Sequence, residues 1–585
     1  MAKRGNAMHV STTRRYYQLK DGTKRMHEAT LLRRSYREGN KVKNETLSNL
    51  SPLPATTIDL IRESLAGKSH VVAGEDFDIE RSLAHGHVAA VYALANKLGM
   101  PKLLGPPCPQ RDLALSIIIA RALKPASKLA TTRWLADTTL GADLVPDNTS
   151  TDDVYAAMDW LYSRQDSTEA ALARRHLTKD SMVLYDLSSS WMEGTHCPLA
   201  HYGYSRDHKS GKPQIEYGLM TDVDGRPISI EVFASNTADP KAFVSAVECV
   251  RNKFGLKEVV MVGDRGMITS ARIEALRHLG GMSWIICLRA PAIKALAEQG
   301  SVQQSLFDEA NLQEITHPDY PGERLVACLN PVLAQELTRK RNELLAATEA
   351  NLEKVQAATT RTRCPLRGKD QIALRAAKVL NRHKMAKHFE LTITDTAFSF
   401  TRKPKEIAAE AALDGIYVVR TTVASERLDA TGVVEAYKGL KVVEEGFRSL
   451  KAIDLDLRPV HHYLEDRPRA HVLICMLAYY LVWHLRKAWA PLCFTDEEPP
   501  VRSDPVAAAK QSRAAKAKAA HKTTTDREHP AHSLATLLDH LATLTRNTIV
   551  FAGGVRIEKL ALPTDLQRRA FKLIGASVPL ALRQM

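Results

Sequence analysis

Two acidic residues stand just after apolar runs that could form buried strands. Asp186 follows Met182–Tyr185, and Asp264 comes two positions after Val259–Val262. Both runs have the composition of a buried strand, and in α/β sheets functional sites are built at the carboxyl ends of strands. A carboxylate buried there is costly without a cation, so one interpretation is a metal ligand. The alternative is an Asp that caps the next turn.

A third acidic residue lies in a segment with helical spacing. Thr431–Lys451 is predicted to form one helix, and one of its faces carries Tyr437, Glu444, Arg448 and Lys451. The apolar residues that point more to the other side are Val442, Val443, Phe447 and Leu450. The alternative is a surface helix with spaced ion pairs, each worth only about 0.2–0.5 kcal/mol.

Three carboxylates far apart in the sequence can converge on two divalent cations. In such a site one ion activates an attacking hydroxyl, and the other stabilises the leaving oxygen of a phosphodiester. Carboxylates suit Mg²⁺, which keeps several waters and takes substrate oxygens as further ligands. Asp186, Asp264 and Glu444 are therefore candidates for metal-dependent phosphodiester chemistry.

The segments around these acids predict a mixed α/β core in the order β-β-β-α-β-α-β. After the strand that leads to Asp186, the expected strands are Ile215–Thr221, Pro227–Phe233, Val259–Val262 and Ser283–Leu288, and the expected helices are Pro240–Phe254 and Thr269–Leu279. Asp224-Gly225 is a strong hairpin signal between the second and third strands. A further strand, Gly415–Arg420, precedes the helix of Glu444.

Segments outside this core have distinct patterns. Residues 290–412 are predicted to be an insertion with a long charged helix, Pro331–Ala358, and a strand pair, Phe389–Thr394 and Ala397–Thr401. His471–Trp483 is predicted to be a buried core helix, because it is too short to span a bilayer. Near the C-terminus we expect a basic linker or marginal helix, Ala507–Ala520, and a helical tail with Leu534–Leu544 and Leu566–Ile574.

The N-terminal third divides into a basic part and a helical part. Residues 1–50 carry twelve Lys and Arg against four Asp and Glu, and their predicted strands are Tyr16–Leu19, Ala29–Tyr36 and Thr46–Leu50. This basic meander could dock on phosphates or be a solvated appendage. Helical spacing follows in Val88–Leu98, Leu113–Leu123, Lys128–Leu135 and Asp153–Leu161. That helical region is a second candidate for DNA binding.

The composition of the chain indicates what kind of partner it binds and in which cellular compartment we expect it. The 585 residues carry a net charge of +15, which favours an anionic partner such as nucleic acid. Eight cysteines without a CxxC pair indicate neither a zinc ribbon nor a disulfide framework. No apolar signal segment follows the basic N-terminus. We therefore expect a cytoplasmic protein with no membrane partner.

With these motifs in view, the chain resembles DDE transposases of bacterial insertion sequences, in the branch with a Tyr–Arg–Glu–Lys signature. Tyr437, Glu444 and Lys451 have the spacing of that signature, and Leu440 stands where the family has Arg. Lys441 or Arg448 is then expected to supply the missing phosphate contact. The Asp motifs that match are Tyr185-Asp186-Leu-Ser-Ser and Val262-Gly-Asp264-Arg-Gly-Met, and the resemblance covers roughly 180–490.

The resemblance implies an RNase H-like catalytic fold that binds terminal inverted repeats and target DNA, and cuts and joins DNA as a homodimer or higher multimer. It implies that Asp186, Asp264 and Glu444 bind two Mg²⁺ ions, for which Mn²⁺ is expected to substitute. Tyr437 and Lys451 would hold DNA phosphates. Glu445 competes for the third metal position, but it is rotated by about 100° from Glu444 on a helix.

Some relatives stack a flipped base on a Trp of the insertion, and 290–412 contains no Trp. Stacking would then fall to Phe398, Phe400 or another aromatic side chain, or the hairpin route of cleavage does not apply. A zinc site built from His196, Cys197, His201 and His208 is a further alternative, although its spacing matches no standard set. Ser188–Ser190 lack the Gly-x-Ser-x-Gly surroundings of a nucleophile.

These interpretations divide the chain into six parts. They are a basic β-rich region (1–75), a helical candidate for DNA binding (76–178), the first part of the core (179–290), the insertion (291–412), the second part of the core with the Glu helix (413–492), and a basic linker with a helical tail (493–585). Besides a transposase, two functions stay open. One is a stand-alone metal-dependent nuclease on the same fold, and the other is an inactive, transposase-derived DNA-binding protein.

Overall fold

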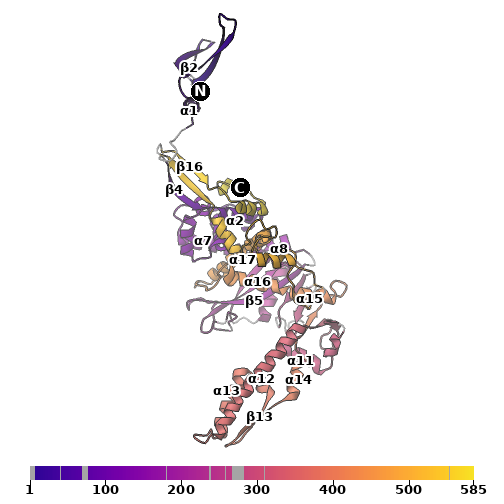
Figure 1. Ribbon diagram of the computed structural model, residues 1–585. Helices are drawn as coiled ribbons and strands as arrows, with labels where there is room; N and C mark the ends of the chain where they lie inside the picture. The colour runs from indigo at the N-terminus through magenta and orange to yellow at the C-terminus, as the bar shows by residue number, and fades with distance from the viewer. Residues whose placement is uncertain are drawn as a thin grey trace. The chain divides into compact units, whose positions relative to one another are not determined.

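The computed structural model divides the chain into two compact units (Figure 1). Unit 1 contains Met1–Ser82 and Asn547–Lys559, and unit 2 contains Leu83–Arg546 and Leu560–Met585. The structure describes residues 7–39, 41–68, 77–178, 181–203, 205–207, 209–235, 239–256, 259–265, 282–308, 310–502, 504–551 and 554–584. The predicted helix Thr269–Leu279 lies outside the described residues.

Unit 1 begins with the basic meander that the sequence predicts. The strands β1 (Ala7–Gln18), β2 (Lys24–Glu38) and β3 (Lys41–Asn49) form an antiparallel sheet in that order, and α1 (Ala55–Leu65) follows. At the first turn Gly22 has a φ of 84°, which favours glycine. From Met8 onward, the side chains of the three strands are exposed or only partly buried. The cations of this sheet are therefore accessible to a large anion.

A second sheet of unit 1 joins distant parts of the chain and corrects the prediction of a purely helical tail. Its order is β16-β15-β4, with β4 (Phe77–Ala84), β15 (Thr545–Phe551) and β16 (Arg556–Leu560). The Phe77 and Phe551 rings lie 6.2 Å apart. Short strands with mixed polarity carry a weak local signal, and β15 is stabilised by pairing with a strand far away in the sequence.

Unit 2 is built on an eight-stranded mixed sheet with the order β10-β11-β14-β9-β8-β5-β6-β7. Its strands are β5 (Met182–Trp191), β6 (Gln214–Thr221), β7 (Pro227–Ala234), β8 (Val259–Gly263), β9 (Met282–Cys287), β10 (Leu312–Ile315), β11 (Arg324–Leu329) and β14 (Ile416–Thr421). The pairs β5–β8 and β8–β9 are parallel, and the other neighbours are antiparallel. The mixed α/β class is thus confirmed.

Two features of this sheet differ from the sequence expectations. Asp186 lies inside β5 and not at its end, because β5 continues through Ser188–Ser190 and pairs with β6 as far as Trp191. The turn-capping alternative for Asp186 is therefore wrong. In addition, β10 and β11 join the core sheet although they lie within the expected insertion at 291–412.

Helices pack around this sheet, and the sequence predicts four of those that precede β5, at 88–98, 113–123, 128–135 and 153–161. In unit 2 the helices before β5 are α2 (Gly86–Lys97), α3 (Met100–Leu104), α4 (Pro109–Leu123), α5 (Lys128–Ala136), α6 (Thr139–Leu144), α7 (Thr151–Tyr162) and α8 (Gln165–His176). A capping box of Ser150 and Asp153 begins α7. Between β7 and β11 lie α9 (Asp239–Glu248), a π-helix (Cys249–Lys253) and α11 (Ala290–Glu298).

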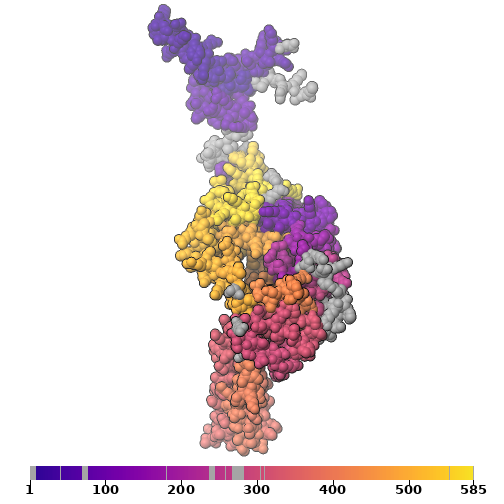
Figure 2. Space-filling model, turned by 90° about the vertical axis from the view of Figure 1, so that its right-hand side faces the viewer, coloured from indigo at the N-terminus to yellow at the C-terminus, as the bar shows by residue number. Residues whose placement is uncertain are grey.

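One long helix, α17 (Asp466–Ala488), holds these layers together. It packs against α2, α4, α7 and β7, and the predicted core segment at its centre is almost completely buried. The C-terminal helices α18 (Arg513–His521), α19 (Leu534–Ala542) and α20 (Asp565–Ile574) follow. Both α19 and α20 contact α2, and Figure 2 shows their yellow surface next to the purple N-terminal helices. No helix among the described residues is long and apolar enough to cross a membrane.

The segment between β11 and β14 has a small core of its own. It contains α12 (Pro331–Thr360), α13 (Lys369–His383), the hairpin β12–β13 (Phe389–Ile393, Phe398–Arg402) and α14 (Pro404–Ala411), and Figure 1 shows α12 and α13 side by side. Phe398 is 2% exposed and belongs to this core. The prediction that Phe398 stacks on a base is therefore wrong, because its ring already packs inside the protein.

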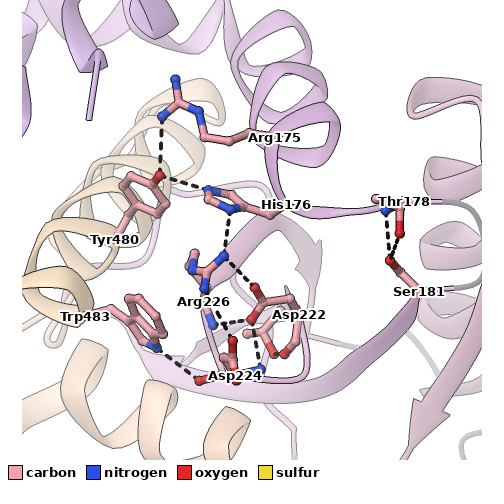
Figure 3. Close-up of polar contacts among 10 residues, drawn as sticks. Arg175, His176, Thr178, Ser181, Asp222, Asp224, Arg226, Tyr480 and Trp483 are labelled. Atoms are coloured by element: carbon pink, nitrogen blue, oxygen red, sulfur yellow. Dashed lines mark hydrogen bonds and ion pairs between the residues drawn. The ribbon is translucent and has the colours of Figure 1, made fainter. Parts of the chain in front are cut away.

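The turn of the β6–β7 hairpin is fixed to two helices through Arg226 (Figure 3). Arg226 pairs with Asp222 at 3.1 Å and donates to His176 Nδ1 at 2.7 Å, and its guanidinium lies 4.5 Å from the Trp483 ring centre. Because Arg226 can only donate, His176 carries its proton on Nε2 and donates to the Tyr480 hydroxyl at 2.9 Å. Burial, with the charges of Arg226 and Arg175, lowers the pKa of His176 to about 4.

This network predicts that acid weakens unit 2. The pKa of His176 is lower in the folded chain than its ordinary 6.5, so the stabilisation is complete above pH 6.5 and is lost as the pH falls toward 4. Given the partial exposure of His176, the loss should be on the order of 1–2 kcal/mol. The other groups that face His176 are Arg175, Arg226, Tyr480 and His484.

Thermal melts of wild type and His176→Gln between pH 4 and pH 8 test this. Gln can accept from Arg226 and donate to Tyr480 without titrating, so the variant should lose less stability on acidification. Parallel curves of melting temperature against pH would contradict the role of His176.

Candidate active site

The register of two parallel strands brings the two aspartates together. In the β5–β8 pair Tyr185 lies opposite Gly263, so the next step along both strands places Asp186 beside Asp264. Neighbouring strands lie about 4.8 Å apart. Two carboxylates that are 78 positions apart in the sequence thus become neighbours at the carboxyl end of β8.

Both aspartates face the layer of helices that carries Glu444. Leu184 and Val262, two positions before each Asp, pack in one core with Val443 and Phe447, whereas Tyr185 packs in the core on the other face of the sheet. Side chains two apart on a strand share a face. Asp186 and Asp264 therefore point toward the face that this helical layer covers.

That layer is two helices and not the single helix expected over Thr431–Lys451. The chain forms α15 (Ala430–Lys438), bends at Gly439, and continues as α16 (Leu440–Arg448) and a π-helix (Ser449–Ile453). A Cβ on Gly439 would lie 2.9 Å from the Ala436 carbonyl oxygen, so the bend needs a small residue there. The prediction of one continuous helix over Thr431–Lys451 is therefore wrong.

Glu444 and Glu445 are neighbours on α16, but their charges influence different side chains. Both are exposed on α16, which packs against β5 and β6. Glu445 lies 3.6 Å from Lys441 on the same helix. The charge of Glu444 acts on Asp186 and that of Glu445 acts on Tyr479. Of the two glutamates, Glu444 is therefore the one whose charge reaches Asp186.

The pKa of Asp186 is affected by its burial and by the neighbouring carboxylates. Burial raises its pKa to about 7, the Leu187 amide that donates to its Oδ1 at 2.7 Å opposes this, and the charges of Asp264 and Glu444 raise the pKa further. Arg206, which donates to the Leu187 carbonyl at 3.0 Å, is the cation that acts on Asp186. The sequence did not single out Arg206, whose role depends on how the 192–213 loop folds back onto β5.

Tyr437 and Asp264 are linked directly. The Tyr437 hydroxyl donates to Asp264 Oδ1 at 3.4 Å, across 173 positions of sequence. Burial, with the charge of Asp264, raises the pKa of Tyr437. At neutral pH the phenol therefore keeps its proton and can orient this carboxylate.

Lys451 lies in a different environment from the one the sequence suggests. It is 9% exposed, and its Nζ donates to Asp207 Oδ1 at 2.8 Å, where Arg458 also pairs. Burial lowers the pKa of Lys451, while Asp207 opposes that shift. The π-helix turns more slowly per residue than an α-helix, which moves Lys451 off the exposed face of Glu444. Lys451 is therefore not a solvent-exposed side chain of a surface helix.

The structure also shows the surroundings of Leu440 and of the two cations considered in its place. Leu440 is buried in the main core, so a guanidinium at this position would be placed among apolar side chains. Lys441 and Arg448 are exposed on α16. They are the cations of this helix that a phosphate could reach.

No group of three or more His, Cys, Asp and Glu side chains in the described residues could hold a metal ion as it stands. This covers the zinc alternative at His196, Cys197 and His201, whereas His208 lies outside the described residues. Asp186, Asp264 and Glu444 nevertheless fit Mg²⁺ by donor type, since each offers carboxylate oxygens. Their mutual charge effect on Asp186 is the kind of strain that a bound cation relieves.

A family model described as "Transposase DDE domain" matches residues 188–481, which is half of the chain. The chain belongs to this DDE transposase family. The match includes Asp264 and Glu444 and begins two residues after Asp186. Membership of this family confirms the transposase resemblance, while the Tyr–Arg–Glu–Lys branch stays a prediction.

Solved structures give weaker comparisons. The piggyBac transposase synaptic complex with hairpin DNA is similar over 68% of this chain and 72% of that chain, at 9% identity and a TM-score of 0.31. The Argonaute of Aquifex aeolicus is similar over 49% of this chain and 66% of that chain, at 9% identity and a TM-score of 0.14. At these scores neither carries an argument about the DDE transposase domain. No curated protein sequence matches the chain.

The two neighbouring glutamates of the DDE transposase domain give a matched pair of variants. Glu444→Gln should reduce metal-dependent DNA cleavage by more than about 100-fold, since even groups that only orient metal ligands are worth about 10–100-fold. Glu445→Gln should change it by no more than about twofold, because an exposed ion pair contributes about 0.3–0.5 kcal/mol. Cleavage rates of the two purified variants decide the assignment. The reverse order of effects would place the metal ligand one residue later.

Proposed function

We propose that this chain is a transposase of an insertion sequence that binds terminal inverted repeats and catalyses Mg²⁺-dependent DNA cleavage and strand transfer on an RNase H-like core. The observation that carries the proposal is the β5–β8 register, which makes Asp186 and Asp264 neighbours on the face that α16 covers. Family membership supports the reaction class. Assembly as a homodimer or higher multimer on DNA is part of the same proposal.

In this mechanism Asp186, Asp264 and Glu444 hold the metal. Two bound Mg²⁺ ions would supply an activated hydroxyl and charge stabilisation at the leaving oxygen. Asp186 is fixed by the sheet and by the Leu187 amide, and Asp264 is oriented by the Tyr437 hydroxyl. Glu444 approaches from α16, whose buried side is anchored by Val443 and Phe447. The protein would thus position one ligand within a strand, one directly after a strand and one on a helix.

DNA would be held by cations outside this cluster. Lys441 and Arg448 are exposed on α16, and Tyr437 lies beside Asp264. We assign Lys451 to a phosphate as well. In the structure Lys451 pairs with Asp207. A phosphate that binds Lys451 must therefore either share this ammonium with the Asp207 carboxylate or displace the carboxylate from it.

Reading of the inverted repeat is proposed for the N-terminal regions 1–75 and 76–178. The exposed β1-β2-β3 sheet carries an excess of Lys and Arg, which suits binding to the DNA backbone. The separate fold of the 331–411 segment supports its assignment as an insertion between the two parts of the core. A nuclease without strand transfer is the competing function, and a joining assay with a cut end and target DNA separates the two.

If the triad holds the metal, substitutions in it should abolish DNA cleavage without abolishing DNA binding. Asp186→Asn, Asp264→Asn and Glu444→Gln should each abolish cleavage, while affinity for terminal-repeat DNA stays within a few-fold, since phosphate and base contacts carry most affinity. Mg²⁺ should also raise the melting temperature of wild type more than that of Asp186→Asn. Cleavage at a wild-type rate by any one variant would remove that residue from the triad.

Lys451 and Asp207 allow a test of the phosphate contact. Lys451→Ala should weaken DNA binding and lower the salt dependence by about one phosphate, and raising Mg²⁺ should not rescue it. Asp207→Asn removes the internal competitor and should strengthen binding. The measurement is DNA affinity at several salt concentrations. If neither variant changes the salt slope, Lys451 has only the structural role of pairing with Asp207.

A further inference from the structure

A basic pocket lies in unit 2 apart from the triad. Its volume is about 660 Å³, and its walls come from the end of α4, the start of α5, α7, α17 and the loop after the π-helix. The Arg, Lys, Asp and His residues that line it are Arg121, Lys128, Asp456, Arg458, His461, His462 and His471. Only one of the seven is acidic.

Lys128 is a buried cation of the basic pocket, and it forms no ion pair with any residue that the structure describes. It is 8% exposed, and its Nζ donates to His471 Nδ1 at 3.1 Å. The other nitrogen of His471 donates to the Leu457 carbonyl at 3.1 Å, which fixes the imidazole as a neutral acceptor for Lys128. Burial, together with the charge of Arg121, lowers the pKa of Lys128 to about 7. The ammonium is thus held by a neutral partner only.

Arg121 repeats this pattern. It is 6% exposed and donates only to backbone carbonyls, to Ala126 at 2.9 Å and to Leu455 at 3.5 Å. In the described part of the chain neither Arg121 nor Lys128 forms an ion pair. A buried charge without a counter-charge is costly. Two such charges in one pocket indicate that an anion belongs there.

Another buried lysine shows what compensation looks like in this protein. Lys518 is also buried, but it donates to the carbonyls of Ala490, Cys493 and Thr495 and pairs with Glu497 at 2.8 Å. The fold can therefore satisfy a buried ammonium completely. Lys128 lacks a carboxylate partner of this kind among the described residues, and its side chain borders the basic pocket.

We propose that the basic pocket binds a phosphate group, with Lys128 and Arg121 as its inner donors and Arg458 and His461 at its rim. Arg and Lys together suit a tetrahedral anion with several acceptor oxygens. A metal is excluded by the adjacent ammonium of Lys128, and no metal-holding group occurs among the described residues. The volume is larger than one phosphate needs and leaves room for the sugar that carries it.

The chemistry fits two sources, a DNA backbone phosphate and a free phosphate or nucleotide. DNA is favoured because Arg458 also pairs with Asp207, which binds Lys451. The basic pocket is thereby connected to the end of the helix that carries Glu444. Choosing DNA rests on the proposed function, whereas phosphate binding itself does not.

The test uses the full chain in buffer without phosphate or sulfate, with Asp186→Asn in every DNA measurement so that the substrate stays intact. Lys128→Met removes the inner charge and keeps much of its volume, and Lys518→Met is the matched control. Arg121→Gln is the second variant if Lys128→Met fails to fold. The two readouts are the melting temperature as inorganic phosphate is added, and DNA affinity at several salt concentrations.

Added phosphate should raise the melting temperature of wild type and of Lys518→Met but not of Lys128→Met. Lys128→Met should bind DNA about tenfold more weakly, the effect of one charged hydrogen bond, with a salt slope lower by about 1. A change in DNA binding assigns the site to DNA, and a phosphate response without it assigns the site to free phosphate. If Lys128→Met matches Lys518→Met in both readouts, the proposal is overturned. Since neither readout requires cleavage, an inactive triad would leave this result intact.

Discussion

The repulsion between carboxylates on two adjacent parallel strands is the constraint around which unit 2 is arranged. β5 and β8 bring Asp186 and Asp264 side by side, and α16 adds Glu444 to the same face. Such crowding is unfavourable in the absence of cations. The surroundings hold it in place through the Leu187 amide, the Tyr437 hydroxyl and the firmly packed α15–α16 layer. A bound cation would offset this repulsion.

The parts of this site that depend on local pattern could be predicted from sequence. Apolar runs identified β5 and β8, and helical periodicity separated Glu444 from the buried Val443 and Phe447. The position of Lys451 could not be predicted, because seven residues bring it back to one face only if the helix stays α-helical. The π-helix at Ser449–Ile453 breaks that rule, and nothing in the residue types signals it.

Contacts between distant segments account for the other differences. β10 and β11 lie within the stretch predicted to be an insertion, and their place in the core sheet depends on pairing between distant segments, since β11 pairs with β14 and β10 pairs with β11. Asp207 and Arg458 lie in loops without periodicity, so their convergence on Lys451 has no sequence signal. The basic pocket is a similar case, since Arg121 and Lys128 sit in helices predicted for their apolar faces and only the fold places His471 and Arg458 opposite them.

The sheet of β4, β15 and β16 has a consequence for how the chain is made. Ser82 in β4 donates to Asn547 in β15, 465 positions later. During synthesis β4 leaves the ribosome early and keeps an open edge until the last tenth of the chain appears. Since domains tend to fold as their residues emerge and long-range strand pairing is slow, unit 2 can assemble most of its core while this sheet is still incomplete. Ribosomes that stop early would therefore release chains with the three acids in place but an unprotected strand edge, a form prone to aggregation.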